Sequence, residues 1–126
     1  MESFSKISSI SVRLKEAMDK TGLKQVDLVR LSGIDKGSIS HYISGTYEPK
    51  QTAIYKLSKA LNVSEMWLWG YDCPMERPIE QKENDELADL VARLQKETDF
   101  RQLIIKISHL KPEKLELIKN LVEAFM

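Results

Sequence analysis

The side chains with the clearest chemical potential in this sequence lie between positions 36 and 41. This stretch has the sequence KGSISH, and it places Lys36, Ser38, Ser40 and His41 around a single apolar residue, Ile39. Hydroxyl groups donate and accept hydrogen bonds, an ammonium group donates them, and a neutral imidazole does one of each. We find no glycine-rich phosphate loop, no paired metal ligands and no nucleophile with a base at motif spacing. The pattern therefore favours recognition by hydrogen bonding, and we expect no enzymatic activity.

Two short predicted helices position these side chains. Asp35 is a good N-cap for a helix that continues to about Ser44, and Gly45 can end it in a left-handed conformation. A shorter helix, about 25–31, precedes it and ends at Ser32-Gly33. A tight turn between two such helices lets the first helix support the second, which then projects from the protein surface. A projecting helix with a polar outer face suits the major groove of B-DNA, which is about 12 Å wide.

The order of these features resembles a known family. The segment KQVDLVRLSGIDKGSISHYISGTYEPK, followed by IYKLSKALNVSEMWLWG, resembles the helix-turn-helix domain of phage repressors (Cro/CI and XRE-like regulators) and their bacterial relatives. Gln25 opens the second helix, Gly33 lies in the turn, Ile39 is the buried anchor and Gly45 ends the third helix. The stretch WLWGYDCPM more narrowly resembles repressors of temperate phages of Gram-positive bacteria.

The resemblance implies a fold, a function and a set of contacts. It implies an all-α chain whose residues 1–70 form a five-helix, lambda-repressor-like domain. It further implies a sequence-specific regulator of transcription that binds double-stranded DNA, most simply a phage or prophage repressor that binds palindromic operators as a dimer. The expected base-reading residues are Lys36, Gly37, Ser38, Ser40 and His41. The expected phosphate-binding residues are Lys24, Gln25, Ser44, Thr46, Tyr47 and Lys50.

Some of these positions depart from the family pattern, and others have more than one possible role. Gly37 brings no side chain to a usual reading position. Lys24 and Lys50 stand where the family often has a capping Ser, Thr or Asn, so we expect phosphate contacts there at the expense of a cap. His41 is open to contact with a base, contact with a phosphate, or plain solvation. Tyr47 is open to phosphate contact or loop packing.

Composition sets the wider limits. The chain has 126 residues, of which 42% are hydrophobic and 30% charged, so it suits one ordinary domain, or one small domain with an appended element. Its net charge is zero, with 10 Lys/Arg against 8 Asp/Glu in residues 1–74 and 9 against 11 in residues 75–126. The sequence has a single cysteine, Cys73, no apolar run approaching about 18 residues and no signal-peptide pattern. These features predict a cytoplasmic, nucleoid-associated protein. We expect no metal site and no cofactor.

The second half of the chain is the natural candidate for self-association. Residues 71–82 contain two prolines and no helical stripe, which predicts a linker, and residues 83–126 carry about three amphipathic helical patterns. We expect the last pattern to centre a homodimer interface; its apolar residues are Leu115, Ile118, Leu121, Val122 and Phe125. One competing arrangement pairs the N-terminal domains directly and folds the tail back on its own head. An alternative function is an antitoxin whose C-terminal segment neutralises a partner protein, and an antirepressor protein is a further partner for a repressor.

Overall fold

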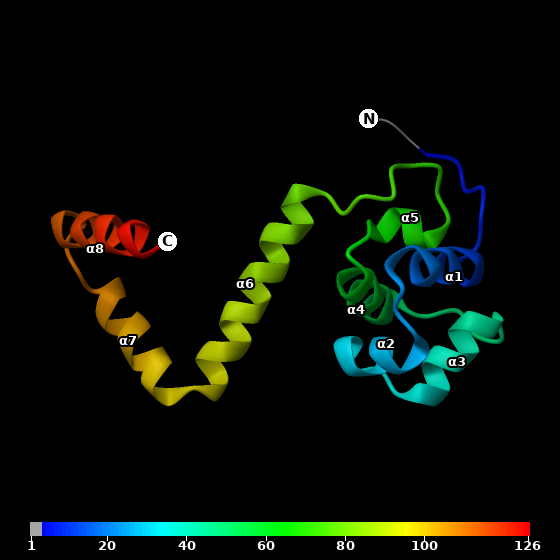
Figure 1. The fold of residues 1–126 in the computed structure, drawn as a ribbon, viewed down its shortest axis with the longest axis horizontal. Helices are drawn as coiled ribbons and strands as arrows, with labels where there is room; N and C mark the ends of the chain where they lie inside the picture. Colours follow the sequence, from blue (N-terminus) through cyan, green and yellow to red (C-terminus); the bar gives the residue numbers. More distant parts are fainter. Residues whose placement is uncertain (1–3) are drawn as a thin grey trace. The chain divides into compact units, whose positions relative to one another are not determined.

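Residues 4–126 are described by a computed structural model, and in this part of the chain all regular structure is helical (Figure 1). The helices are α1 (Ile10–Thr21), α2 (Gln25–Ser32), α3 (Lys36–Ser44), α4 (Gln51–Leu61), α5 (Glu65–Trp69), α6 (Ile79–Lys96), α7 (Thr98–Ser108) and α8 (Pro112–Phe125). Extended pairing within this range is limited to two isolated bridges, Lys6 with Tyr71 and Val63 with Glu76. The predicted all-α class, with five helices followed by about three, is confirmed.

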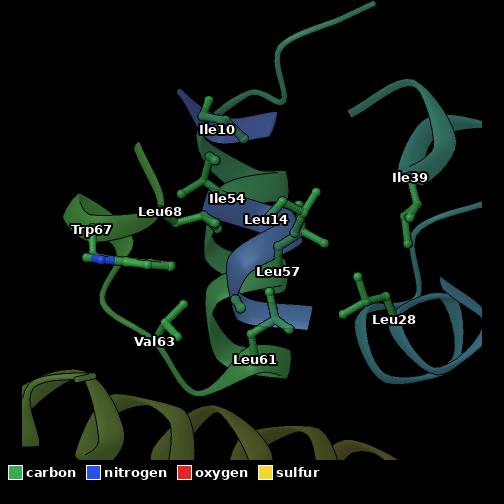
Figure 2. Close-up of a cluster of buried hydrophobic side chains, with 11 residues drawn as sticks. Ile10, Leu14, Leu28, Ile39, Ile54, Leu57, Leu61, Val63, Trp67 and Leu68 are labelled. Carbon is green, nitrogen blue, oxygen red and sulfur yellow. The ribbon is translucent and has the colours of Figure 1, made fainter. Parts of the chain in front are cut away.

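The chain divides into two compact units, one ending at Glu83 and the other spanning Asn84–Met126. The first unit contains α1 to α5 around one hydrophobic core (Figure 2). Ile39 of α3 and Leu28 of α2 are fully buried in it, and so are Leu14 of α1 and Leu57 of α4. Trp67 of α5 is 6% exposed. The core therefore fixes the positions of α2 and α3 through their buried sides, and the opposite sides of both helices face solvent.

Local signals explain why these helices begin and end where they do. Side-chain oxygens of Ser9, Asp35 and Ser64 accept backbone N–H groups at the starts of α1, α3 and α5. Gly70 follows α5 at φ 105, and a Cβ there would lie 2.2 Å from the carbonyl oxygen of Ser8. Only glycine fits at this position, because the chain before α1 passes directly over it. The amides of Ile7 and Ser8 both donate to the Gly70 carbonyl.

The segment expected as a linker, residues 71–82, is ordered against the first unit for much of its length. Arg77 is only 4% exposed. Its Nη1 donates to Ser58 Oγ and to the Val63 carbonyl at 3.0 Å each, and to Gln81 Oε1 at 3.1 Å. Helix α6 already begins at Ile79. The Arg77 side chain thus links the first turn of α6 to α4 and to the turn between α4 and α5.

Removal of the Arg77 guanidinium should destabilise the first unit. Arg77→Ala leaves the Val63 carbonyl and the Ser58 hydroxyl without their buried donor, which costs about 1–3 kcal/mol for such groups. We expect the free energy of unfolding in urea titrations to fall by at least about 2 kcal/mol, because two acceptors are affected at about 1 kcal/mol or more each. Arg101→Ala, at an exposed position of α7, is the control. Equal stability of Arg77→Ala and the wild-type chain would show that the bonds contribute nothing.

The second unit has no buried residue in any of its helices. Its internal contacts include the Arg93 guanidinium, which lies 3.8 Å from the centre of the Phe100 ring and 2.6 Å from Glu97. Much of its apolar surface faces solvent: Leu121 is 55% exposed, Val122 51% and Phe125 85%. An isolated unit of this length with so little burial is marginal. The predicted helices are present, and their apolar faces are only partly covered within their own unit.

Candidate DNA-binding surface

Helices α2 and α3 are joined by a three-residue turn, Gly33–Asp35, and pack against each other. Gly33 adopts a left-handed conformation, φ 73, and its N–H donates to the Val29 carbonyl. Ser32 Oγ donates to the Leu28 carbonyl and accepts the Ile34 N–H. These bonds satisfy the end of α2 and set the direction of α3. The predicted helices 25–31 and 35–44 are found at Gln25–Ser32 and Lys36–Ser44.

The start of α3 is held by Asp35. Its Oδ2 accepts the Ser38 N–H at 2.9 Å, and its Oδ1 accepts the Ser38 hydroxyl at 2.8 Å. These bonds from Ser38 hold the pKa of the Asp35 carboxyl below its ordinary value. The contribution of this cap to stability is therefore complete above the pKa of an unfolded aspartate. It is lost as the pH falls through the lowered pKa of the folded protein.

The bond to Asp35 also limits what Ser38 can offer to a ligand. Its hydroxyl proton is directed to the carboxylate, so the Ser38 oxygen is available mainly as an acceptor. The amino groups of adenine and cytosine are the hydrogen-bond donors of the major groove. The geometry therefore suits Ser38 to those two bases.

The other expected base-reading residues lie on the outer face of α3. Lys36, Gly37, Ser40 and His41 are exposed, and Ser38 is half-buried. Ile39 points into the core and is fully buried. The structure thus places these residues together on one short helix. Contact with bases remains a prediction for each of them.

The loop after α3 brings further polar groups to the same side. The rings of Tyr47 and His41 meet edge to face, with centroids 4.8 Å apart. Ser44 and Thr46 share a hydrogen bond of 2.7 Å between their hydroxyls, and the Thr46 N–H donates to the His41 carbonyl. The aromatic contact supports loop packing for Tyr47, yet the side chain stays 61% exposed and is available to a phosphate as well.

An open groove of about 560 Å³ lies between α3, this loop and the start of α4. Its lining includes four of the expected contact residues: Ser38, His41, Tyr47 and Lys50. It also includes Thr52 and Lys56 of α4, which the sequence had not singled out. Lys56 lies one and a half turns inside a helix with an ordinary amphipathic pattern, so only its place beside the groove distinguishes it from a solvated lysine.

The two lysines at unusual cap positions leave their helices without a side-chain cap. Lys24 precedes α2 and Lys50 precedes α4, and neither side chain makes a capping hydrogen bond. Asp27 partly compensates at α2, because its carboxylate accepts the Lys24 N–H at 2.8 Å. Both ammonium groups are exposed, and Gln25 is half-buried in the first turn of α2. Their contact with phosphates is a prediction.

The match to known families agrees with this geometry. A family model described as helix-turn-helix matches residues 14–68, which run from α1 through α5. This segment is a helix-turn-helix domain. The match supports DNA-binding transcriptional regulation rather than an enzymatic activity. It includes α2, the turn and α3, so the helix-turn-helix domain contains all the residues placed on the recognition side.

Seven solved chains are similar to this one, among them the following three. The restriction-modification controller protein C.AhdI from Aeromonas hydrophila is 30% identical, with 47% of this chain and 89% of that chain covered and a TM-score of 0.45. The P22 c2 repressor protein in complex with synthetic operator 9T is 26% identical, with 49% and 94% covered and a TM-score of 0.46. A transcriptional regulator from Listeria innocua is 17% identical, with 92% and 91% covered and a TM-score of 0.46. No curated protein matches the chain.

Within residues 4–126, no group of three or more His, Cys, Asp or Glu side chains could hold a metal ion. In the same range, no helix combines the length and the apolarity needed to cross a membrane.

Proposed function

We propose that the chain is a sequence-specific regulator of transcription, most simply a phage or prophage repressor, that binds palindromic operators as a dimer. In this proposal α3 enters the major groove, where Lys36, Gly37, Ser38, Ser40 and His41 meet base edges. The flanking groups at Lys24, Gln25, Ser44, Thr46, Tyr47 and Lys50 hold the phosphate backbone. Phosphate contacts fix the register and orientation, and base contacts select the sequence.

One observation carries the proposal: α3 exposes a row of hydrogen-bonding groups while Ile39 anchors it in the core. A helix on a rigid support reads a groove more precisely than a loop does. The family match to residues 14–68 supports the same assignment. Because the net charge is zero, affinity depends on the few cations beside α3 rather than on a strongly basic surface.

The exposed apolar faces of the second unit support dimerisation as part of this function. A single helix-turn-helix domain meets one short half-site and gains few base contacts. Two linked domains add their contacts through a high effective concentration. We assign the centre of the pairing surface to α8; its apolar residues are Leu115, Ile118, Leu121, Val122 and Phe125. All of these are exposed except Ile118, which is half-buried.

The same exposed faces also fit the alternative function, in which α6 to α8 bind a partner protein such as a toxin. The two readings differ in what covers the apolar surface. Sedimentation of the pure chain as a homodimer favours the repressor. A monomeric chain that forms a stoichiometric complex with the product of the adjacent gene favours the antitoxin. An antirepressor would bind the homodimer and release it from DNA.

The phosphate contacts can be tested through the salt dependence of operator binding. Each ion pair with a phosphate releases about 0.9 counterion, so Lys50→Ala should reduce the slope of log K against log salt by about 0.9. Gln25→Ala should weaken binding with an unchanged slope, because its side chain is neutral. The measurement is fluorescence anisotropy of a labelled duplex over a salt series.

Lys20→Ala is the matched control for this series. Lys20 lines a separate hollow with Asn62 and Glu76, so its loss removes the same charge from another part of the unit. Equal changes of slope in Lys20→Ala and Lys50→Ala would mean that only the total charge matters, and the assignment of Lys50 would fail.

A further inference from the structure

A small hollow lies where the start of α2 meets the start of α3. Its volume is about 150 Å³, and it is lined by Gln25, Val26, Val29 and Lys36. Val26 and Val29 are three residues apart on α2, so they are neighbours on one side of the helix. Val29 is partly buried against the core, and Val26 is 70% exposed. The hollow is therefore an apolar recess that opens to solvent.

The recess lies between two residues of the proposed DNA surface. Gln25, on one side, is a proposed phosphate contact, and Lys36, on the other, is a proposed base contact. The nearby Asp27 of α2 already has partners: its carboxylate accepts the Lys24 backbone N–H and lies 3.6 Å from the Arg30 guanidinium. A single exposed apolar side chain is ordinary on a protein surface. Here, however, two valines form a recess between two side chains that are to meet the same duplex.

The chemistry of the groove limits what can enter such a recess. Base edges in the major groove present donors and acceptors, and the C5-methyl of thymine is their one apolar group. A polar edge against the valines would lose water without gaining a partner, which is unfavourable. A methyl group buried there gains free energy from the hydrophobic effect.

We propose that this recess receives the C5-methyl group of an operator thymine and that Val26 is a specificity-determining residue. The inference rests on the proposed function and deepens it. Val26 supplies the exposed wall of the recess, Val29 supplies its buried wall, and the aliphatic parts of Gln25 and Lys36 close its sides. The site selects thymine over cytosine at one position of each half-site.

The test begins with operator sequences selected by the full-length protein from a randomised duplex library. Each conserved thymine is then replaced in turn by uracil, which removes the methyl group and keeps the base pair. At one position per half-site we expect affinity to fall about fourfold, as the burial of one methyl predicts. In Val26→Ala the same replacement should change affinity less than twofold, so the two changes are coupled.

Val12→Ala is the control, since Val12 is an exposed valine on α1. It should retain the full fourfold response to uracil. The proposal is overturned if no thymine responds to uracil, or if Val26→Ala responds as strongly as the wild type. Failure to enrich any sequence would instead refute the proposed function itself, so the two failures are distinguishable.

Discussion

Replacing Lys36, Ser38 and His41 together by alanine should abolish specific binding while the domain stays folded. Each base contact discriminates by about 1–3 kcal/mol. Loss of three should lower operator affinity by at least about 100-fold, since about 1.4 kcal/mol corresponds to a factor of ten. Binding to unrelated duplex should fall far less, because phosphate contacts supply it. Titration of the variant against the operator and a scrambled duplex measures both.

A second triple variant controls for charge and folding. Lys15→Ala, Glu16→Ala and Lys20→Ala change three exposed residues of α1 and, with His41 neutral, reduce the net charge by the same amount. We expect this variant to bind the operator as the wild type does. The Asp35 cap keeps its bond from the Ser38 N–H in the α3 variant, so both proteins should unfold at similar temperatures. Undiminished operator affinity in a folded α3 variant would overturn the assignment of the reading helix.

Disruption of the α8 apolar face should lower operator affinity about as much as the α3 triple variant does, but by preventing dimerisation. The double variant Leu121→Asp, Phe125→Asp places two charges in a surface that a dimer would bury, and burial of unpaired charges is costly. We expect a monomer in sedimentation equilibrium and a fall in operator affinity of at least about 100-fold, the low end of what linkage of two sites contributes.

Asn120→Asp is the matched control on α8. It introduces a carboxylate on the opposite side of the helix from the apolar residues. This variant should remain dimeric with full affinity. If the double variant also stays dimeric and binds normally, pairing belongs to the N-terminal domains instead. A monomeric variant that still binds at full affinity would show that dimerisation is not needed for recognition.

The sequence predicted the helices of the first unit closely because their boundaries depend on local chemistry. Asp35 caps α3, Gly33 and Gly45 end α2 and α3, and Ile39 is the one large apolar residue in the polar stretch from 36 to 41. These signals act within four residues and are visible in the sequence. The same holds for the absence of caps at Lys24 and Lys50, whose amines cannot accept a backbone N–H.

Long-range arrangements were beyond what the sequence pattern could predict. Residues around Arg77 have no helical period, so they suggested a linker. Yet Arg77 is buried through bonds to Ser58 and Val63, which lie 19 and 14 residues away. The contribution of Lys56 to the groove likewise depends on how α4 packs beside the loop. The recess of Val26 and Val29 forms only when α3 brings Lys36 next to α2.

Footprinting of the full-length protein on the DNA that flanks its own gene tests the central claim most directly. A dimer that reads two half-sites should protect a palindromic sequence at nanomolar protein. The centres of protection should lie one helical turn apart, about 34–36 Å, or a multiple of that distance. Protection should vanish with the α3 triple-alanine variant. Uniform, weak protection of all sequences, with no preferred site up to micromolar protein, would contradict the account.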